Sequence, residues 1–428
     1  MKDLHDYYNS DVVRISPREI SFINSSAWKD IHGSRSGHAS FEKDPSVYRK
    51  PPNDTASLLT ANRVDHARMR RIIGHAFSDR ASREQEPVLE SYVNLLISRL
   101  HEQLASANGE VDISKWFRWT AFDIAGDLSF GESFHCLQNQ ELHSWAEMIA
   151  GFLKADGCLA ACNRFRAFQR ILPNLLSKKT KEMMRDHFAA TVEKVSRRMK
   201  LGARRPDFIS PILKYNEEGK GLTQAEINSN ASLFIVAGSD STATLLTGTI
   251  YYLLKNKQVL TRLSNEVRTT FKTEADITVR SVTQSPYVIA CLDETARMYP
   301  PVQTGQVVIV PPEGDTVGKE WIPGGVSNVL KDLDTLCRSL TPQTMSSLLL
   351  CSRLIASFRR LVSGSTCMPP TVLLGTSRNQ TPTRRNGGLM IAGLQTTIGR
   401  CFIHSRTVTG AASERSKATG RDPHLHEH

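Results

Sequence analysis

The segment 223–254 contains no proline, and this constrains the fold of the chain more than any other feature. Thr223 followed three positions later by Glu226 forms a capping-box pattern, which marks the start of a helix. Apolar residues then recur as far as Leu254. At 1.5 Å per residue, a helix of this length extends roughly 45 to 50 Å, which is long enough to cross a whole domain. The segment therefore predicts a domain built around one long helix.

A glycine in the middle of this helix needs an explanation, because it costs about 1 kcal/mol relative to alanine. We expect Gly238 to open the helix locally, so that a flat cofactor or small ligand can lie against the backbone. The hydroxyls of Ser239, Ser241 and Thr242 would then satisfy the freed carbonyls. Asp240 beside Ser241 forms an acid–alcohol pair suited to proton transfer. A polar patch on a helix surface is the alternative interpretation of these residues.

A second helix is predicted from 286 to its end at Tyr299. Ser285 stands at the cap position and Pro286 at the first helical position, and two prolines follow the helix. Glu294 and Arg297 lie three apart and share one face. A pair of this kind on a surface contributes only a few tenths of a kcal/mol, so the pair alone carries little information.

The remaining patterns before residue 325 are also mainly helical, without an internal repeat. Apolar spacing predicts helices over 64–76, 86–105 and 116–128. Short β-branched runs at 12–15 and 19–22 flank a Ser-Pro turn and predict two small strands. The predicted fold class is therefore mainly α with small β-sheets.

The last 103 residues differ in composition from the rest. Segment 326–428 holds thirteen Lys and Arg against five Asp and Glu, so +8 of the net charge of +11 lies there. It has no Trp or Tyr, and its best helix candidate is 342–361, with Thr341 as a possible cap. We expect two parts: a folded domain over 1–325 and a basic, Ser/Thr/Arg-rich, disordered tail over 326–428.

Composition narrows the class of protein. No apolar run approaches the roughly 20 residues needed to span a bilayer, and the start lacks the pattern of a secretory signal. The eight cysteines show no metal-binding spacing, so no metal ligands are predicted. We expect a soluble protein in the cytoplasm or at the periphery of the endoplasmic reticulum, without an anchor. The basic tail could contact RNA or an anionic membrane, but it lacks aromatic interleaving and a nucleic-acid module, so no nucleic-acid partner is expected.

Four segments in combination resemble the cytochrome P-450 family, in particular its fungal secondary-metabolism members. They are the A-G-S-D-S-T motif at 237–242, D-E-T-A-R-M-Y-P-P at 293–301, D-H-A-R-M-R-R at 65–71 and F-D-I-A-G-D-L-S-F-G at 122–131. The resemblance covers about 5–325. It implies a cytochrome P-450-like helical fold that is incomplete at the C-terminal end of this chain.

The resemblance assigns roles to the long helix. In the family the matching stretch crosses the distal face of the haem, so Ala237 and Gly238 would lie against the cofactor. Asp240 would be the acid and Ser241 the proton-delivering alcohol, followed by Thr242. The family usually has threonine at the position of Ser241. Serine keeps the hydroxyl but loses the methyl group that restricts its rotamer, so looser coupling is expected.

Further roles follow from the same resemblance. His66 and Arg70, one turn apart, would reach a haem propionate, and a basic stripe facing solvent or nucleic acid is the alternative. Glu294 and Arg297 would form a buried network supporting the haem-binding loop. Breaking such a buried pair costs on the order of 3–5 kcal/mol.

One departure from the family bears on activity. Family members bind iron through a cysteine in the pattern Phe-x-x-Gly-x-Arg-x-Cys-x-Gly, whose thiolate favours O–O cleavage. Four cysteines lie downstream, and each of them lacks that pattern: Cys337, Cys351, Cys367 and Cys401. Cys401 comes nearest to it, because it follows a Gly-Arg pair. Val308 stands where the family often carries an arginine to a propionate.

Three interpretations therefore remain. The first is a haem monooxygenase that takes electrons from an NADPH-dependent reductase and hydroxylates a small apolar metabolite with O2. The second is a truncated, inactive and haem-free relative, and the third is a binding protein with a basic tail. The missing cysteine pattern favours a family member that is inactive as this sequence stands.

Overall fold

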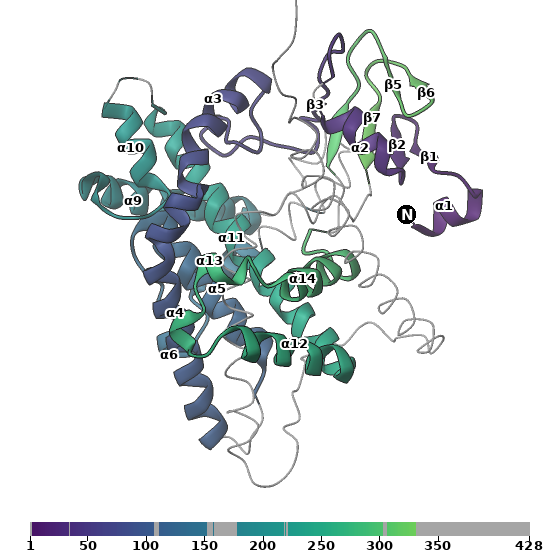
Figure 1. Cartoon of the computed structure of the whole chain (residues 1–428). Coiled ribbons are helices and arrows are strands. Elements are labelled where there is room, and N and C mark those ends of the chain that lie inside the picture. Colours follow the sequence, from purple (N-terminus) through teal and green to yellow (C-terminus); the bar gives the residue numbers. More distant parts are fainter. Residues whose placement is uncertain are drawn as a thin grey trace, which may run out of the picture.

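The long helix predicted from the sequence is the centre of the structure. A computed structural model describes residues 2–33, 35–106, 111–151, 157, 178–217, 219, 221–302 and 306–330. Helix α11 (Gln224–Lys255) begins at the predicted capping box, in which Thr223 and Glu226 bond reciprocally. It packs against α5 (Ile113–Phe130), α14 (Pro286–Met298) and α9 (Lys178–Lys200), as Figure 1 shows. The predicted fold class, mainly α with small sheets, is confirmed.

Helix α11 runs through both large hydrophobic clusters of the described residues. Ile227, Ala231 and Ile235 pack with residues of α5 and of α3 (Arg63–Ile73). Leu246 and Leu253 pack with residues of α14, α4 (Asp79–Ser106) and α12 (Lys257–Thr270). By length and composition α11 could also cross a membrane, but 56% of its most apolar window is buried inside the protein. Its apolar character is thus accounted for by its central position in the core.

Most of the remaining helices surround this rod at one end of the molecule, whereas the two N-terminal helices α1 (Lys2–Tyr8) and α2 (Ser25–His32) lie beside the strands at the other end (Figure 1). The predicted helices 64–76, 86–105 and 116–128 are confirmed with shifted ends, and the helix near 86 begins earlier because it continues through Pro87. The described residues also form α6 (Cys136–Asn139), α10 (Ile209–Glu217), α13 (Val279–Val282) and a 3-10 turn (Gly74–Phe77) after α3.

A five-stranded sheet lies at the other end, in the order β1-β2-β7-β4-β3. Its strands are β1 (Val12–Ser16), β2 (Glu19–Phe22), β3 (Glu42–Lys43), β4 (Val307–Ile309) and β7 (Ser327–Leu330). Strand β7 pairs in parallel with β2 and antiparallel with β4. A separate hairpin joins β5 (Asp315–Val317) to β6 (Glu320–Ile322). Regular structure thus continues through Leu330, past the boundary expected at residue 325, and the predicted helix 342–361 lies outside the described residues.

Candidate functional site

The middle of α11 is an unbroken helix, so the local opening expected at Gly238 is wrong. The Ser239 hydroxyl donates to the Ile235 carbonyl at 2.7 Å, and the Ser241 hydroxyl donates to the Ala237 carbonyl at 2.5 Å. Both bonds reach back one turn to carbonyls that already belong to the helical ladder. The hydroxyls therefore add bonds to an intact helix and fill no gap in the ladder.

Gly238 faces a neighbouring helix. A Cβ atom added there would lie 3.4 Å from the Cβ of Ala125 in α5. Asp240 is exposed, and with 3.6 residues per turn it lies on the opposite side of α11 from Gly238. Ala237 and Ser241 lie one turn apart on a half-buried face between these two directions. A Cβ at this position would thus make an ordinary van der Waals contact with α5. The acid and the glycine do not share one surface.

A cavity of about 110 Å³ adjoins Gly238 between α11, α5 and α4. Three of the predicted site residues meet at its wall, namely Ala237, Gly238 and Thr242. The rest of the lining is mostly apolar, with Ser82 and Gln85 of α4 as its other polar residues. Thr242 is 6% exposed and belongs to this cavity, whereas Asp240 does not. The motif at 237–242 is therefore divided between an internal cavity and an open helix face.

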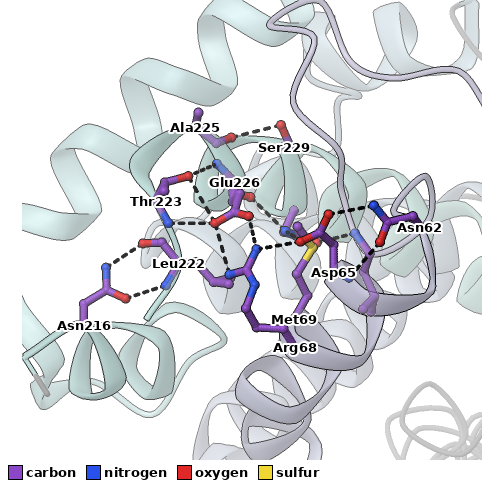
Figure 2. A network of polar contacts seen from close by, with 12 residues as sticks. Asn62, Asp65, Arg68, Met69, Asn216, Leu222, Thr223, Ala225, Glu226 and Ser229 are labelled. Carbon is purple, nitrogen blue, oxygen red and sulfur yellow. Dashed lines mark hydrogen bonds and ion pairs between the residues drawn. The ribbon is translucent and has the colours of Figure 1, made fainter. Parts of the chain in front are cut away.

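The basic residues of α3 form two separate groups, the first of which contains Arg68. Figure 2 shows Arg68 forming an ion pair with Glu226, the capping residue of α11, and a longer bond of 3.4 Å to Asp65. Burial alone would raise the pKa of Glu226, but the hydrogen bonds from Arg68 and Thr223 together with the charge of Arg68 outweigh it and lower this pKa. The pair joins α3 to the start of α11 across 158 positions. No local sequence pattern could have indicated a pairing over that separation.

His66 and Arg70 belong to a second group, which Lys43 of β3 completes. Burial, with a smaller contribution from the charge of Arg70, lowers the pKa of Lys43 to about 8. Burial also lowers the pKa of His66, with additional contributions from Lys43 and Arg70. Within the described part of the chain none of the three forms a salt bridge. We call Lys43, His66 and Arg70 the basic cluster, and sequence reasoning missed its lysine.

Glu294 and Arg297 form the pair that the sequence suggested on α14. The Arg297 guanidinium donates two bonds of 2.8 Å, one to each carboxylate oxygen of Glu294. The side chain of Glu294 is 7% exposed and that of Arg297 is 31% exposed. Glu294 is therefore buried, whereas Arg297 remains partly accessible to water. At the start of α14, Ser285 and Pro286 occupy the predicted cap and first-turn positions. The buried Ser285 hydroxyl forms no capping bond and has no hydrogen-bond partner among the described residues.

The cysteines of the described residues do not resemble metal ligands. Cys136 and Cys291 are both buried, and burial is the main cause that raises the pKa of the Cys136 thiol to about 12. Cys337, Cys351, Cys367 and Cys401 lie outside the described residues. Among the residues that are described, no group of three or more His, Cys, Asp or Glu is arranged to hold a metal ion.

Comparison with known proteins decides the family. The model of the cytochrome P450 family matches residues 1–311. The chain belongs to the cytochrome P450 family. Among curated relatives, it is 42% identical over 322 residues to cytochrome P450 monooxygenase astA of Talaromyces wortmannii, an alignment covering 75% of this chain and 64% of the relative. It is 41% identical over 332 residues to cytochrome P450 monooxygenase lcsI of Purpureocillium lilacinum, covering 76% and 64%. The P450 chain thus spans about 64% of the length of these relatives.

Membership of the P450 family implies haem, and the described residues fit one part of it. The basic cluster brings together the cations Lys43 and Arg70 and the imidazole of His66, which form no ion pair within the described part of the chain, and this suits the two propionate carboxylates at the haem edge. The axial position is different, because neither Cys136 nor Cys291 stands in the thiolate pattern of the family. The described part of this P450 chain therefore fits the periphery of haem and does not fit its axial ligation.

Proposed function

We propose that this chain is a P450 monooxygenase-type protein that retains the carboxylate-anchoring and oxygen-side elements of a haem site but does not form a haem–thiolate complex. The observation that carries the proposal is the absence of the Phe-x-x-Gly-x-Arg-x-Cys-x-Gly pattern from all 428 residues. The thiolate is the ligand that favours O–O cleavage in this family. Without it, monooxygenation is not expected from the chain as it stands.

The activity lost would be that of a fungal P450 of secondary metabolism. In such an enzyme a reductase that uses NADPH supplies electrons, and a small apolar substrate is hydroxylated with O2. The names of the relatives, which are monooxygenases, support this class of reaction. In such an enzyme, Asp240 and Ser241 would carry the protons; the carboxylate of Asp240 is exposed and Ser241 is half-buried. Ser241 would have to release the Ala237 carbonyl first, because its proton is donated there.

The test is the absorption spectrum of the reduced full-length protein with carbon monoxide after reconstitution with haem. We expect no Soret band at about 450 nm, the position diagnostic of a thiolate ligand, and at most a band at about 420 nm. A band at about 450 nm would overturn the proposal. The variant Cys401→Ser then identifies the ligand, since loss of the band in this variant assigns it to the cysteine that follows the Gly-Arg pair. Failure to bind haem in any form would overturn the haem-anchoring part of the proposal and would identify the protein as a haem-free relative.

A further inference from the structure

We infer that Lys43 is a third basic partner for the carboxylates that His66 and Arg70 would hold, in place of the arginine that the family often carries at the position of Val308. This inference deepens the proposed function and rests on its carboxylate-anchoring site. The ligand class is a molecule with paired carboxylates, as haem has in its two propionates. Lys43 is a binding residue in this assignment and takes no part in chemistry at iron.

The register of the sheet places Lys43 beside Val308. Strand β3 pairs antiparallel with β4, and Lys43 is the direct partner of Val308. Side chains of directly opposed residues in an antiparallel pair project to the same face. Val308 is apolar and 5% exposed, so it offers no charge at this point. Lys43 therefore supplies a cation on the sheet face where the valine has none.

Two hydrogen bonds through Leu58 link the end of the Lys43 side chain to α11. Its Nζ donates to the Leu58 carbonyl at 2.9 Å. The Leu58 amide in turn donates to Asn230 Oδ1 of α11 at 2.8 Å. Because an ammonium carries three donors, two remain available to a ligand. Leu58 thus ties the position of the Lys43 ammonium to α11, the helix that would lie along the cofactor.

The acidic side chains Asp44, Asp65 and Glu226 bind partners outside the basic cluster. Asp44 accepts hydrogen bonds from Ser327 Oγ at 2.6 Å and from the Ser46 amide at 2.8 Å. Asp65 and Glu226 are bound to Arg68. Lys43 and Arg70 lie close enough for the charge of Arg70 to lower the pKa of Lys43, and neither has a carboxylate partner among the described residues. Like charges held together destabilise the charged forms. A dicarboxylate ligand would remove this repulsion, which gives a physical reason for the cluster to bind one.

The test is a titration of the full-length protein with hemin, in which binding is measured by the quenching of tryptophan fluorescence. We expect Lys43→Gln to weaken hemin binding roughly ten- to a hundredfold, the usual effect of losing one charged hydrogen bond. Lys43→Arg restores the affinity. Lys115→Gln, which changes a side chain 67% exposed in a 3.9 Å ion pair on α5, is the matched control and leaves affinity unchanged. Hemin dimethyl ester, which lacks the carboxylate charges, binds the wild type and Lys43→Gln equally.

The pH dependence gives an independent signature. Since the pKa of Lys43 lies at about 8, hemin affinity of the wild type falls as the pH rises through that value, while Lys43→Arg shows no such fall. Equal affinity of the wild type and Lys43→Gln, or an equal loss with the dimethyl ester, overturns the inference.

A wild type that binds no hemin at all contradicts haem anchoring in the proposed function, and a second probe then decides the role of Lys43. Inorganic pyrophosphate should raise the unfolding temperature of the wild type and Lys43→Arg more than that of Lys43→Gln. Equal shifts in all three proteins overturn the inference.

Discussion

Arg297 binds both carboxylate oxygens of Glu294, one turn earlier on α14, through two bonds of 2.8 Å. Glu294 is 7% exposed, so removal of its partner leaves a largely buried carboxylate. The arginine side chain is 31% exposed, which lets water replace part of the interaction. We therefore expect Arg297→Ala to lower the free energy of unfolding by about 2 kcal/mol, less than the 3–5 kcal/mol expected for a fully buried pair.

Urea denaturation of the full-length protein measures this loss. The matched control is Arg80→Ala, which breaks the exposed Arg80–Glu84 pair and should cost less than about 0.5 kcal/mol. Arg297→Lys keeps the charge but loses the two-bond geometry, so its stability should fall between those of wild type and Arg297→Ala. An Arg297→Ala variant as stable as Arg80→Ala would show that the pair has no role in holding α14.

Two glycines on facing helices should respond to alanine in opposite ways. A Cβ on Gly126 of α5 would lie 2.3 Å from the Phe134 ring, whereas one on Gly238 of α11 would lie 3.4 Å from Ala125. Overpacking at Gly126 should cost about 1–3 kcal/mol. Gly238→Ala should be tolerated and should gain up to about 1 kcal/mol from helix propensity. Thermal unfolding of both variants checks the contrast, and a strong loss in Gly238→Ala would mean that α11 and α5 approach more closely than the structure shows.

His187 makes the stability of the fold depend on pH. It is 4% exposed, accepts a bond of 2.7 Å from Trp145 Nε1 and lies 3.0 Å from Ser232 Oγ. Burial lowers the pKa of His187 to about 4, and that of His32 to about 4 as well. Below pH 6.5 the unfolded chain takes up a proton that the folded His187 does not. Stability is therefore lost as the pH falls from about 6.5 towards 4, by on the order of 3 kcal/mol for this residue.

The variant His187→Gln should flatten this part of the stability profile, because glutamine does not titrate. Urea denaturation between pH 4 and pH 7 measures the slope, with His101→Gln on the exposed face of α4 as the control. The contribution of His32 remains in both variants, so a residual slope is expected. Identical slopes for wild type and His187→Gln would exclude His187 as a source of the pH dependence.

Sequence reasoning succeeded where the physical cause is local. The capping box of Thr223 and Glu226 and the pairing of Glu294 with Arg297 depend on residues three apart, and both are confirmed. It failed where the cause is a neighbour distant in sequence. Gly238 lies against Ala125 of α5, which is far from it in sequence. Lys43 lies beside Val308 because β3 pairs with β4. Apolar periodicity identifies a helix but does not reveal which face meets which partner.

The contribution of strand β7 to the sheet can be tested by truncation. Residues Ser327–Leu330 bridge β2 and β4, so a chain truncated after Gly325 loses the strand that joins these two parts of the sheet. A chain truncated after Leu330 keeps it. Each backbone hydrogen bond contributes about 1 kcal/mol, so the shorter chain should be less stable by on the order of 3 kcal/mol or more. Thermal unfolding and limited proteolysis of the two chains measure the difference. Equal stability would place the boundary at residue 325, as composition alone suggested, and would show that β7 adds nothing to the sheet.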